Sequence, residues 1–145
     1  MMNSSELLGI GDASLLYMPT FSDDRGNLTV GEMQGEFPFI PARYFIVFDV
    51  PFGTLRGEHA HKECQQFLLC VKGSCKALLD DGQDRKEVVL DCPNVGLYMP
   101  PMIWGSQYQY TADCALLVLA SHPFQSSDYI NNYNDFLQEI KRRKV

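Results

Sequence analysis

The amino-acid sequence predicts an all-β domain, either a β-sandwich or a barrel, that ends in one short helix. About ten short apolar and aromatic runs, separated by turn-forming residues at a spacing of roughly 8–12 residues, fill most of the chain. Helical periodicity is present only near the C-terminus. Because the 145 residues contain no internal repeat and no low-complexity segment, they predict a single domain over residues 1–145.

The first part of the chain, residues 1–33, predicts an N-terminal strand hairpin. Residues 14–20 (SLLYMPT) and 28–33 (LTVGEM) are strand-like, and the turn-forming cluster SDDRGN lies between them at 22–27. An apolar edge strand needs a pairing partner, so this segment pairs either within its own chain or with a second copy in a dimer.

The strand pattern then continues up to residue 121. The pair KG at 72–73 and the triplet DDG at 80–82 predict hairpin turns. Strands are expected at 43–50, 54–61, 66–73, 74–82, 86–91, 95–101, 103–111 and 114–121.

Residues 127–143 predict the C-terminal helix. Asp128 or Ser127 would cap its start, and the basic run KRRK at 141–144 suits the negative end of the helix dipole. We therefore interpret this run as a solvated helix end and not as a nucleic-acid patch. One apolar face recurs at a spacing of three to four residues through Ile130, Tyr133, Phe136, Leu137 and Ile140.

Composition and charge exclude several classes of protein. The net charge of −6 argues against nucleic acid as a partner, because phosphate binding needs a local excess of lysine and arginine. The sequence shows neither the basic leader of a signal peptide nor a stretch of about 18 apolar residues. We therefore expect neither a signal peptide nor a membrane span. The cysteine count is odd and no CxxC is present, which predicts reduced, buried thiols in a cytoplasmic protein.

Two histidines, His59 and His61, alternate along one expected strand, so both rings point to the same face. That face is a metal site, a proton-transfer site or an ordinary surface. The spacing from Gly53 through the two histidines to Gln66 and Gly73 resembles the first motif of the cupin superfamily, a small jelly-roll barrel. The resemblance therefore implies a cupin-type jelly roll.

The cupin resemblance also shows which metal ligands are missing. Cupin metal sites use three histidines and a carboxylate, whereas this chain has Gln66 in place of the carboxylate and Gly105 where the third histidine would follow Pro100. The remaining histidine, His122, lies outside the motif and is expected on a loop. We therefore expect neither a metal nor another cofactor. Two neutral imidazoles still suit acid/base chemistry near neutral pH.

A narrower resemblance covers residues from about 20 to about 137. The blocks RGEHAHK, CVKGSCKALLDDG, VGLYMPPMIW and LVLASHPFQSSDYINNYNDF resemble the sugar-nucleotide 3,4-ketoisomerases, metal-independent cupins that act on dTDP-4-keto-6-deoxy-D-glucose. The resemblance implies an isomerase that moves the ketone from C4 to C3 through an enediol and yields a dTDP-3-keto-6-deoxyhexose. It also implies a role in deoxyamino-sugar biosynthesis for surface glycans such as O-antigen.

The resemblance assigns roles to particular residues. His59 takes the place of the base, and His61 takes the place of a companion that orients the sugar or relays a proton. The substrate-binding candidates are Arg56 and Arg25 for the diphosphate, Gln66 and Lys62 for polar contacts, and Trp104 and Tyr108 for the pocket wall. For Arg25 the alternative is a solvent-facing turn residue, and for the two aromatic residues it is core packing.

Two departures from the family pattern leave the outcome of the reaction open. Family members that invert C4 carry histidine directly after the tryptophan, and members that retain the configuration typically carry arginine, whereas this chain has Gly105. Arg25, in contrast, resembles the residue that the galacto group carries in the first hairpin. Asn131 replaces a usual arginine in the tail. The alternatives to a ketoisomerase are a non-catalytic cupin that binds a nucleotide-sugar and a metal-dependent cupin oxygenase. The resembling enzymes are homodimers with crossing N-terminal strands, so we also expect a homodimer.

Overall fold

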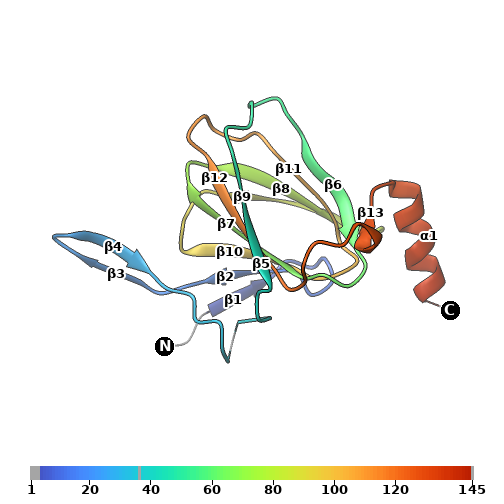
Figure 1. Cartoon of the computed structure of the whole chain (residues 1–145), viewed down its shortest axis with the longest axis horizontal. Helices are drawn as coiled ribbons and strands as arrows, with labels where there is room; N and C mark the ends of the chain where they lie inside the picture. Colours follow the sequence, from blue (N-terminus) through green and yellow to red (C-terminus); the bar gives the residue numbers. More distant parts are fainter. Residues whose placement is uncertain (1–3, 36, 145) are drawn as a thin grey trace.

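A computed structural model describes residues 4–35 and 37–144, and it confirms an all-β fold with one C-terminal α-helix (Figure 1). The strands are β1 (Ser4–Leu7), β2 (Ser14–Tyr17), β3 (Thr20–Asp23), β4 (Gly26–Thr29), β5 (Arg43–Phe48), β6 (Arg56–His61), β7 (Gln66–Lys72), β8 (Cys75–Asp80), β9 (Arg85–Leu90), β10 (Val95–Met99), β11 (Trp104–Tyr108), β12 (Ala115–Ala120) and β13 (Tyr129–Ile130). The helical elements are the 3₁₀ turn η1 (Ser126–Asp128) and the helix α1 (Tyr133–Arg143).

Two antiparallel sheets form the jelly roll that the cupin resemblance implies. The six-stranded sheet has the order β1-β2-β10-β7-β12-β5, and the five-stranded sheet has the order β13-β6-β11-β8-β9. Along β12 buried and half-buried residues alternate, as expected for a strand with one face on the core. The core between the sheets includes Leu68, Leu79, Leu97 and Leu116, each at most 2% exposed. Burying one such side chain contributes about 1.5–3 kcal/mol to folding.

The N-terminal segment differs from the single predicted hairpin. β2 pairs with β1 on one side and with β10 on the other, so it extends the six-stranded sheet. β3 and β4 form a separate two-stranded hairpin that projects away from both sheets (Figure 1). The break between β2 and β3 falls at Met18–Pro19, where proline has no N–H for a sheet hydrogen bond. Residues 1–3 of the predicted segment lie outside the described residues.

The C-terminal helix begins six residues later than predicted. Asn132 caps it, because its side-chain oxygen accepts a hydrogen bond from the Asp135 N–H at 3.0 Å. The preceding residues are instead a 3₁₀ turn and the short strand β13, which pairs with β6. The prediction of Asp128 or Ser127 as the cap was therefore wrong. The described residues contain no helix long and apolar enough to cross a membrane.

Candidate active site

His59 and His61 both face the space between the two sheets. Their ring centroids are 5.0 Å apart and the ring planes are nearly perpendicular, at 89°. The Tyr129 ring on β13 lies 5.0 Å from the His59 ring and 4.4 Å from the His61 ring. His61 is only 5% exposed. The alternative of an ordinary solvent-facing pair therefore does not fit the structure.

An irregularity in β6 sets the direction of His59. Gly57 and Glu58 have φ angles of 83° and 58°, and the register against β11 shifts between Gly105 and Ser106. A Cβ atom on Gly57 would lie 3.0 Å from the Gly105 carbonyl oxygen, so the left-handed conformation and the close approach both require glycine there. Such bulges re-aim the neighbouring side chain.

Each histidine has its Nδ1 atom paired with an oxygen that can only accept a hydrogen bond. His59 Nδ1 donates to the Gly57 carbonyl oxygen at 3.1 Å, and His61 Nδ1 donates to Asp128 Oδ2 at 3.0 Å. Both Nδ1 atoms therefore carry the proton, and both Nε2 atoms keep a free lone pair in the neutral ring. His61 Nε2 is buried and has no hydrogen-bond partner among the described residues.

Asp128 was predicted as a helix cap, but in the structure its carboxylate contacts His61. Its carboxylate also accepts hydrogen bonds from the backbone N–H groups of Glu63 at 2.7 Å and Cys64 at 3.3 Å. These contacts fix the carboxylate against His61 and connect η1 to the end of β6. Because 67 positions separate Asp128 from His61, no local spacing in the sequence indicates the pair.

Burial keeps both imidazoles in the neutral form. The pKa of His59 is lowered to about 4, mainly by desolvation and also by the nearby His61, while the Gly57 hydrogen bond opposes the shift. Desolvation also lowers the pKa of His61, while the hydrogen bond and the charge of Asp128 raise it and Arg43 lowers it. At neutral pH the pair is therefore in the form that accepts protons.

The pocket around the pair consists of two adjoining hollows. One hollow is narrow and borders His61, and the other is a cavity of about 70 Å³ that borders Arg56. The residues that line both hollows are His59, Gln66 and Gln107. Four candidates from the sequence, Arg56, His59, His61 and Gln66, thus lie around one space. Gln107 was not predicted as a site residue, although it follows Gly105 by two residues in a strand and so shares its face.

Trp104 and Tyr108 do not line this pocket, contrary to the prediction. They alternate in β11 with Gly105 and Gln107, which face inward, so their side chains lie on the outer face of the sheet. Trp104 packs against helix α1, with its ring centroid 5.3 Å from that of Tyr133. The Tyr108 hydroxyl donates a hydrogen bond to the Glu87 carboxylate on β9.

Lys62 and Arg25 also lie outside the pocket of their own chain. Lys62 borders a separate surface groove of about 460 Å³ together with Asn132 and Glu139. Arg25 lies at the tip of the β3–β4 hairpin and forms an ion pair with Asp23 at 2.6 Å, with 86% of its side chain exposed. This matches the alternative of a solvent-facing turn residue within the single chain.

Gly105 leaves no empty space on its face of the pocket. A Cβ atom at this position would lie 2.5 Å from Met99 Cε and 3.6 Å from Gln107 Nε2. The Met99 side chain therefore occupies the volume that a longer residue at position 105 would need.

The possible metal ligands near the pair are already hydrogen-bonded. His61, Cys64 and Asp128 place one donor atom each within 4.8 Å of one another. However, His61 Nδ1 donates to Asp128, and two backbone N–H groups donate to the same carboxylate. A cation at this position would have to displace the hydrogen bond that fixes the His61 tautomer. The donor set thus fits an imidazole–carboxylate pair better than a metal centre.

The chain matches a protein-family model and is similar to a curated protein. Residues 11–141 match the family model FdtA, described as WxcM-like, C-terminal. The TDP-4-oxo-6-deoxy-alpha-D-glucose-3,4-oxoisomerase of Aneurinibacillus thermoaerophilus is 40% identical over 120 residues, which cover 83% of this chain and 86% of that protein.

Two solved structures agree. The sugar 3,4-ketoisomerase QdtA of Thermoanaerobacterium thermosaccharolyticum, in complex with TDP, has a TM-score of 0.89 and 34% identity and covers 94% of this chain and 99% of its own. The TDP-quinovose 3,4-ketoisomerase WlaRB of Campylobacter jejuni has a TM-score of 0.84 and 35% identity and covers 89% and 99%. The chain therefore belongs to the FdtA family of WxcM-like proteins.

Proposed function

We propose that this protein is an isomerase that converts dTDP-4-keto-6-deoxy-D-glucose to a dTDP-3-keto-6-deoxyhexose. The observation that carries the proposal is the pair of neutral imidazoles inside a jelly roll of the FdtA family. Their ring centroids are 5.0 Å apart, and each Nε2 atom has a free lone pair. The relative from Aneurinibacillus thermoaerophilus is named as a 3,4-oxoisomerase of TDP-4-oxo-6-deoxy-alpha-D-glucose, which is the same reaction type. The alternatives of a non-catalytic cupin and a metal-dependent oxygenase find no support in these relatives.

The reaction requires two proton transfers and no change in overall composition. We propose that His59 Nε2 removes the C3 proton while the C4 carbonyl oxygen gains one, which produces an enediol. The C3 hydroxyl then loses its proton and C4 gains one, so the ketone is left at C3. A low pKa keeps His59 unprotonated before the substrate binds. General acid–base catalysis of this kind contributes roughly 10²–10⁴-fold in rate.

We assign His61 the second transfer. Asp128 Oδ2, 3.0 Å from His61 Nδ1, stabilises the imidazolium that forms when Nε2 takes up a proton. A ring that gains and returns a proton in this way can relay it between the neighbouring C3 and C4 oxygens. His59 lacks such a carboxylate and has only the Gly57 carbonyl.

Arg56 and Gln66 are the substrate-binding residues that the pocket geometry supports. Arg56 borders the cavity of about 70 Å³, where a guanidinium can pair with the diphosphate. Gln66 borders both hollows and offers a donor and an acceptor to sugar hydroxyls. Arg25, Lys62, Trp104 and Tyr108 are not assigned contacts within one chain.

The configuration of C4 in the product depends on the face from which the proton arrives. Residue 105 is a glycine, so it has no side chain that could deliver a proton from its side of the pocket. The Met99 side chain lies against it instead. The hydrogen removed at C3 and the C4 hydrogen of a gluco product lie on opposite faces of the ring. Delivery by the histidine pair from the face on which His59 removes the C3 proton therefore gives the galacto configuration, and a gluco product requires delivery from the other face. Arg25 resembles the galacto-type residue by sequence, but in the single chain it projects away from the pocket with the β3–β4 hairpin (Figure 1).

We further infer a cytoplasmic homodimer that acts in deoxyamino-sugar biosynthesis, with neither nucleic acid nor membrane as a partner. The outer face of the edge strand β5 supports the dimer, because Tyr44, Ile46 and Phe48 are 68%, 48% and 62% exposed. Light scattering of the purified protein measures the mass. A monomeric mass at micromolar concentration would exclude the dimer.

Hydrogen exchange during turnover tests the proposed isomerisation. In deuterated water, incubation with dTDP-4-keto-6-deoxy-D-glucose is expected to yield the 3-keto product with deuterium at C4, detected by NMR. His59→Asn is expected to abolish turnover and leave nucleotide binding nearly unchanged. His122→Asn, which removes an exposed histidine outside the pocket, is the matched control and should retain full activity. A wild-type protein that binds the substrate without any exchange would contradict the proposal.

A further inference from the structure

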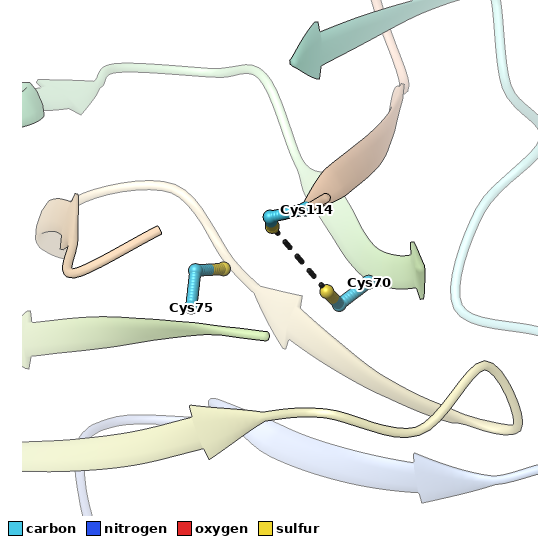
Figure 2. Close-up of side chains that lie close together, drawn as sticks. All are labelled: Cys70, Cys75 and Cys114. Atoms are coloured by element: carbon cyan, nitrogen blue, oxygen red, sulfur yellow. Dashed lines mark hydrogen bonds between the residues drawn. The ribbon is translucent and has the colours of Figure 1, made fainter. Parts of the chain in front are cut away.

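Three cysteines that the proposed reaction does not use converge in the core. Cys70, Cys75 and Cys114 are 1%, 1% and 3% exposed, and their sulfur atoms all lie within 4.8 Å of one another. They come from β7, from the start of β8 and from the residue before β12. Figure 2 shows the three side chains pointing toward a common centre, with Cys70 and Cys114 joined by a sulfur–sulfur contact of 3.6 Å.

The cluster is separate from the histidine pocket. The cluster lies beside the β7–β8 turn. Gln66, which borders the pocket, is at the other end of β7. Cys70 follows Gln66 by four positions along the strand, which corresponds to a distance of about 13 Å. None of the three cysteines lines either hollow, although Leu68 and Leu116, each two positions from Cys70 and Cys114, line the cavity that borders Arg56.

The spacing of the sulfur atoms fits a shared metal ion. A disulfide brings two sulfur atoms to about 2.05 Å, much closer than the observed 3.6 Å. Two thiolates on one ion, each at about 2.3 Å in tetrahedral or trigonal geometry, are roughly 3.8–4.0 Å apart. The observed contact differs from this spacing by a few tenths of an ångström. Binding of an ion would replace the hydrogen bonds that the Cys70 thiol donates to the Lys72 and Gly73 carbonyl oxygens at 3.1 and 3.4 Å.

A buried hydroxyl in the same core cluster also lacks a partner. Tyr110 is 1% exposed, and its Oη atom forms no hydrogen bond with any described residue. Buried polar atoms are nearly always paired, so an unpaired one needs an explanation. The three cysteines belong to the same core cluster, where a thiolate would be a stronger hydrogen-bond acceptor than a neutral thiol.

We propose that Cys70, Cys75 and Cys114 form a three-thiolate site for a soft, thiophilic cation of the Zn²⁺ class. Thiolate ligands select such cations over Mg²⁺ or Ca²⁺, which prefer oxygen. Each thiol that binds releases its proton to solvent, so three protons leave per ion. Entry requires opening of the β7–β8 turn, where Lys72 is exposed and Gly73 adopts a φ of 66°. The bound ion would connect β7, β8 and β12 at one end of the barrel.

The test uses Cd²⁺ as a probe on the full, reduced, chelator-treated protein. We expect one equivalent to bind and produce the ultraviolet absorption of sulfur-to-cadmium charge transfer. Cys75→Ala and Cys114→Ala should lose most of this absorption. Cys64→Ala is the matched control, because Cys64 is also 3% exposed but belongs to the other possible ligand group, with His61 and Asp128. It should retain the absorption in full.

Three outcomes would overturn the proposal. They are absence of the absorption in the wild-type protein, its survival in Cys75→Ala, and its loss in Cys64→Ala, which would place the ion near His61 instead. Should a core variant fail to fold, X-ray absorption of the Zn²⁺-loaded wild-type protein decides the question without any substitution. Three sulfur neighbours at about 2.3 Å support the site, and a nitrogen- or oxygen-dominated shell contradicts it.

Discussion

At the scale of single residues, Asp128 determines where the proton of His61 sits. Replacement by asparagine keeps one oxygen for the Glu63 N–H but turns an NH₂ group toward His61 Nδ1. The ring must then carry its proton on Nε2, which removes the lone pair. We expect Asp128→Asn to lower kcat by about 10²–10⁴-fold with a much smaller change in KM. Steady-state kinetics measure both values.

The control for this variant is Asp135→Asn, which makes the same chemical change on an exposed residue in the first turn of α1. It should leave kcat within about twofold, because helix-end charge effects are worth only a few tenths to about 1 kcal/mol of stability. Equal kcat values for Asp128→Asn and the wild type would show that the carboxylate does not orient the base.

The positions predicted for single residues agree with the structure where one strand sets the geometry. His59 and His61 share a face because they are two positions apart, and the motif added Arg56 and Gln66, which also border the pocket. Alternation along β11 separates its residues into two faces, but it does not say which face is inside. Asp128 could not be found at all, because its contact depends on the packing of η1 against β6.

At the scale of elements, the start of helix α1 can be tested against the earlier start that the sequence predicted. Asn132 accepts the Asp135 N–H, whereas no side chain caps the turn that contains Ser127. We expect Asn132→Ala to lower the free energy of unfolding by about 1 kcal/mol. Ser127→Ala should change it by less than about 0.5 kcal/mol. Urea denaturation of both variants measures the difference, and the reverse order would restore the predicted start.

The packing of β7 against β10 depends on one glycine. A Cβ atom on Gly96 would lie 1.8 Å from Phe67 Cζ, so the phenyl ring covers the bare backbone. We expect Gly96→Ala to cost roughly 1–3 kcal/mol of stability, because the ring must leave its position in the core. Gly53→Ala meets nothing within 4 Å and should be nearly neutral by the same denaturation measurement. Equal stabilities would show that Phe67 relaxes without cost.

At the scale of the whole molecule, strand periodicity and turn residues were enough to predict the fold class and most strand positions. They could not give the order of strands in the sheets, because each strand pairs with partners far along the chain, as β12 does with β7 and β5. The short strands β1 and β13 were not predicted. β1 is exposed at all four positions, so no alternation marks it, and β13 has only two residues.

The two pocket histidines couple the stability of the whole molecule to pH. His59 has a pKa of about 4 in the folded protein, whereas an unfolded chain binds the proton below about 6.5. Between these values the unfolded state holds more protons, so stability falls as pH drops from about 6.5 to about 4. For His59 the loss is at most about 3 kcal/mol. The lowered pKa of His61 acts in the same direction.

Comparison with His59→Asn isolates this effect from the titration of carboxylates, which both proteins share. We expect the melting temperature of the wild type to fall more steeply than that of the variant between pH 6.5 and 4. Over the same range kcat/KM of the folded wild type should not decline with a midpoint near 6.5, because His59 stays unprotonated until about pH 4. Parallel melting curves, together with an activity midpoint near 6.5, would mean that solvent reaches the histidine pair and that the pocket does not desolvate it.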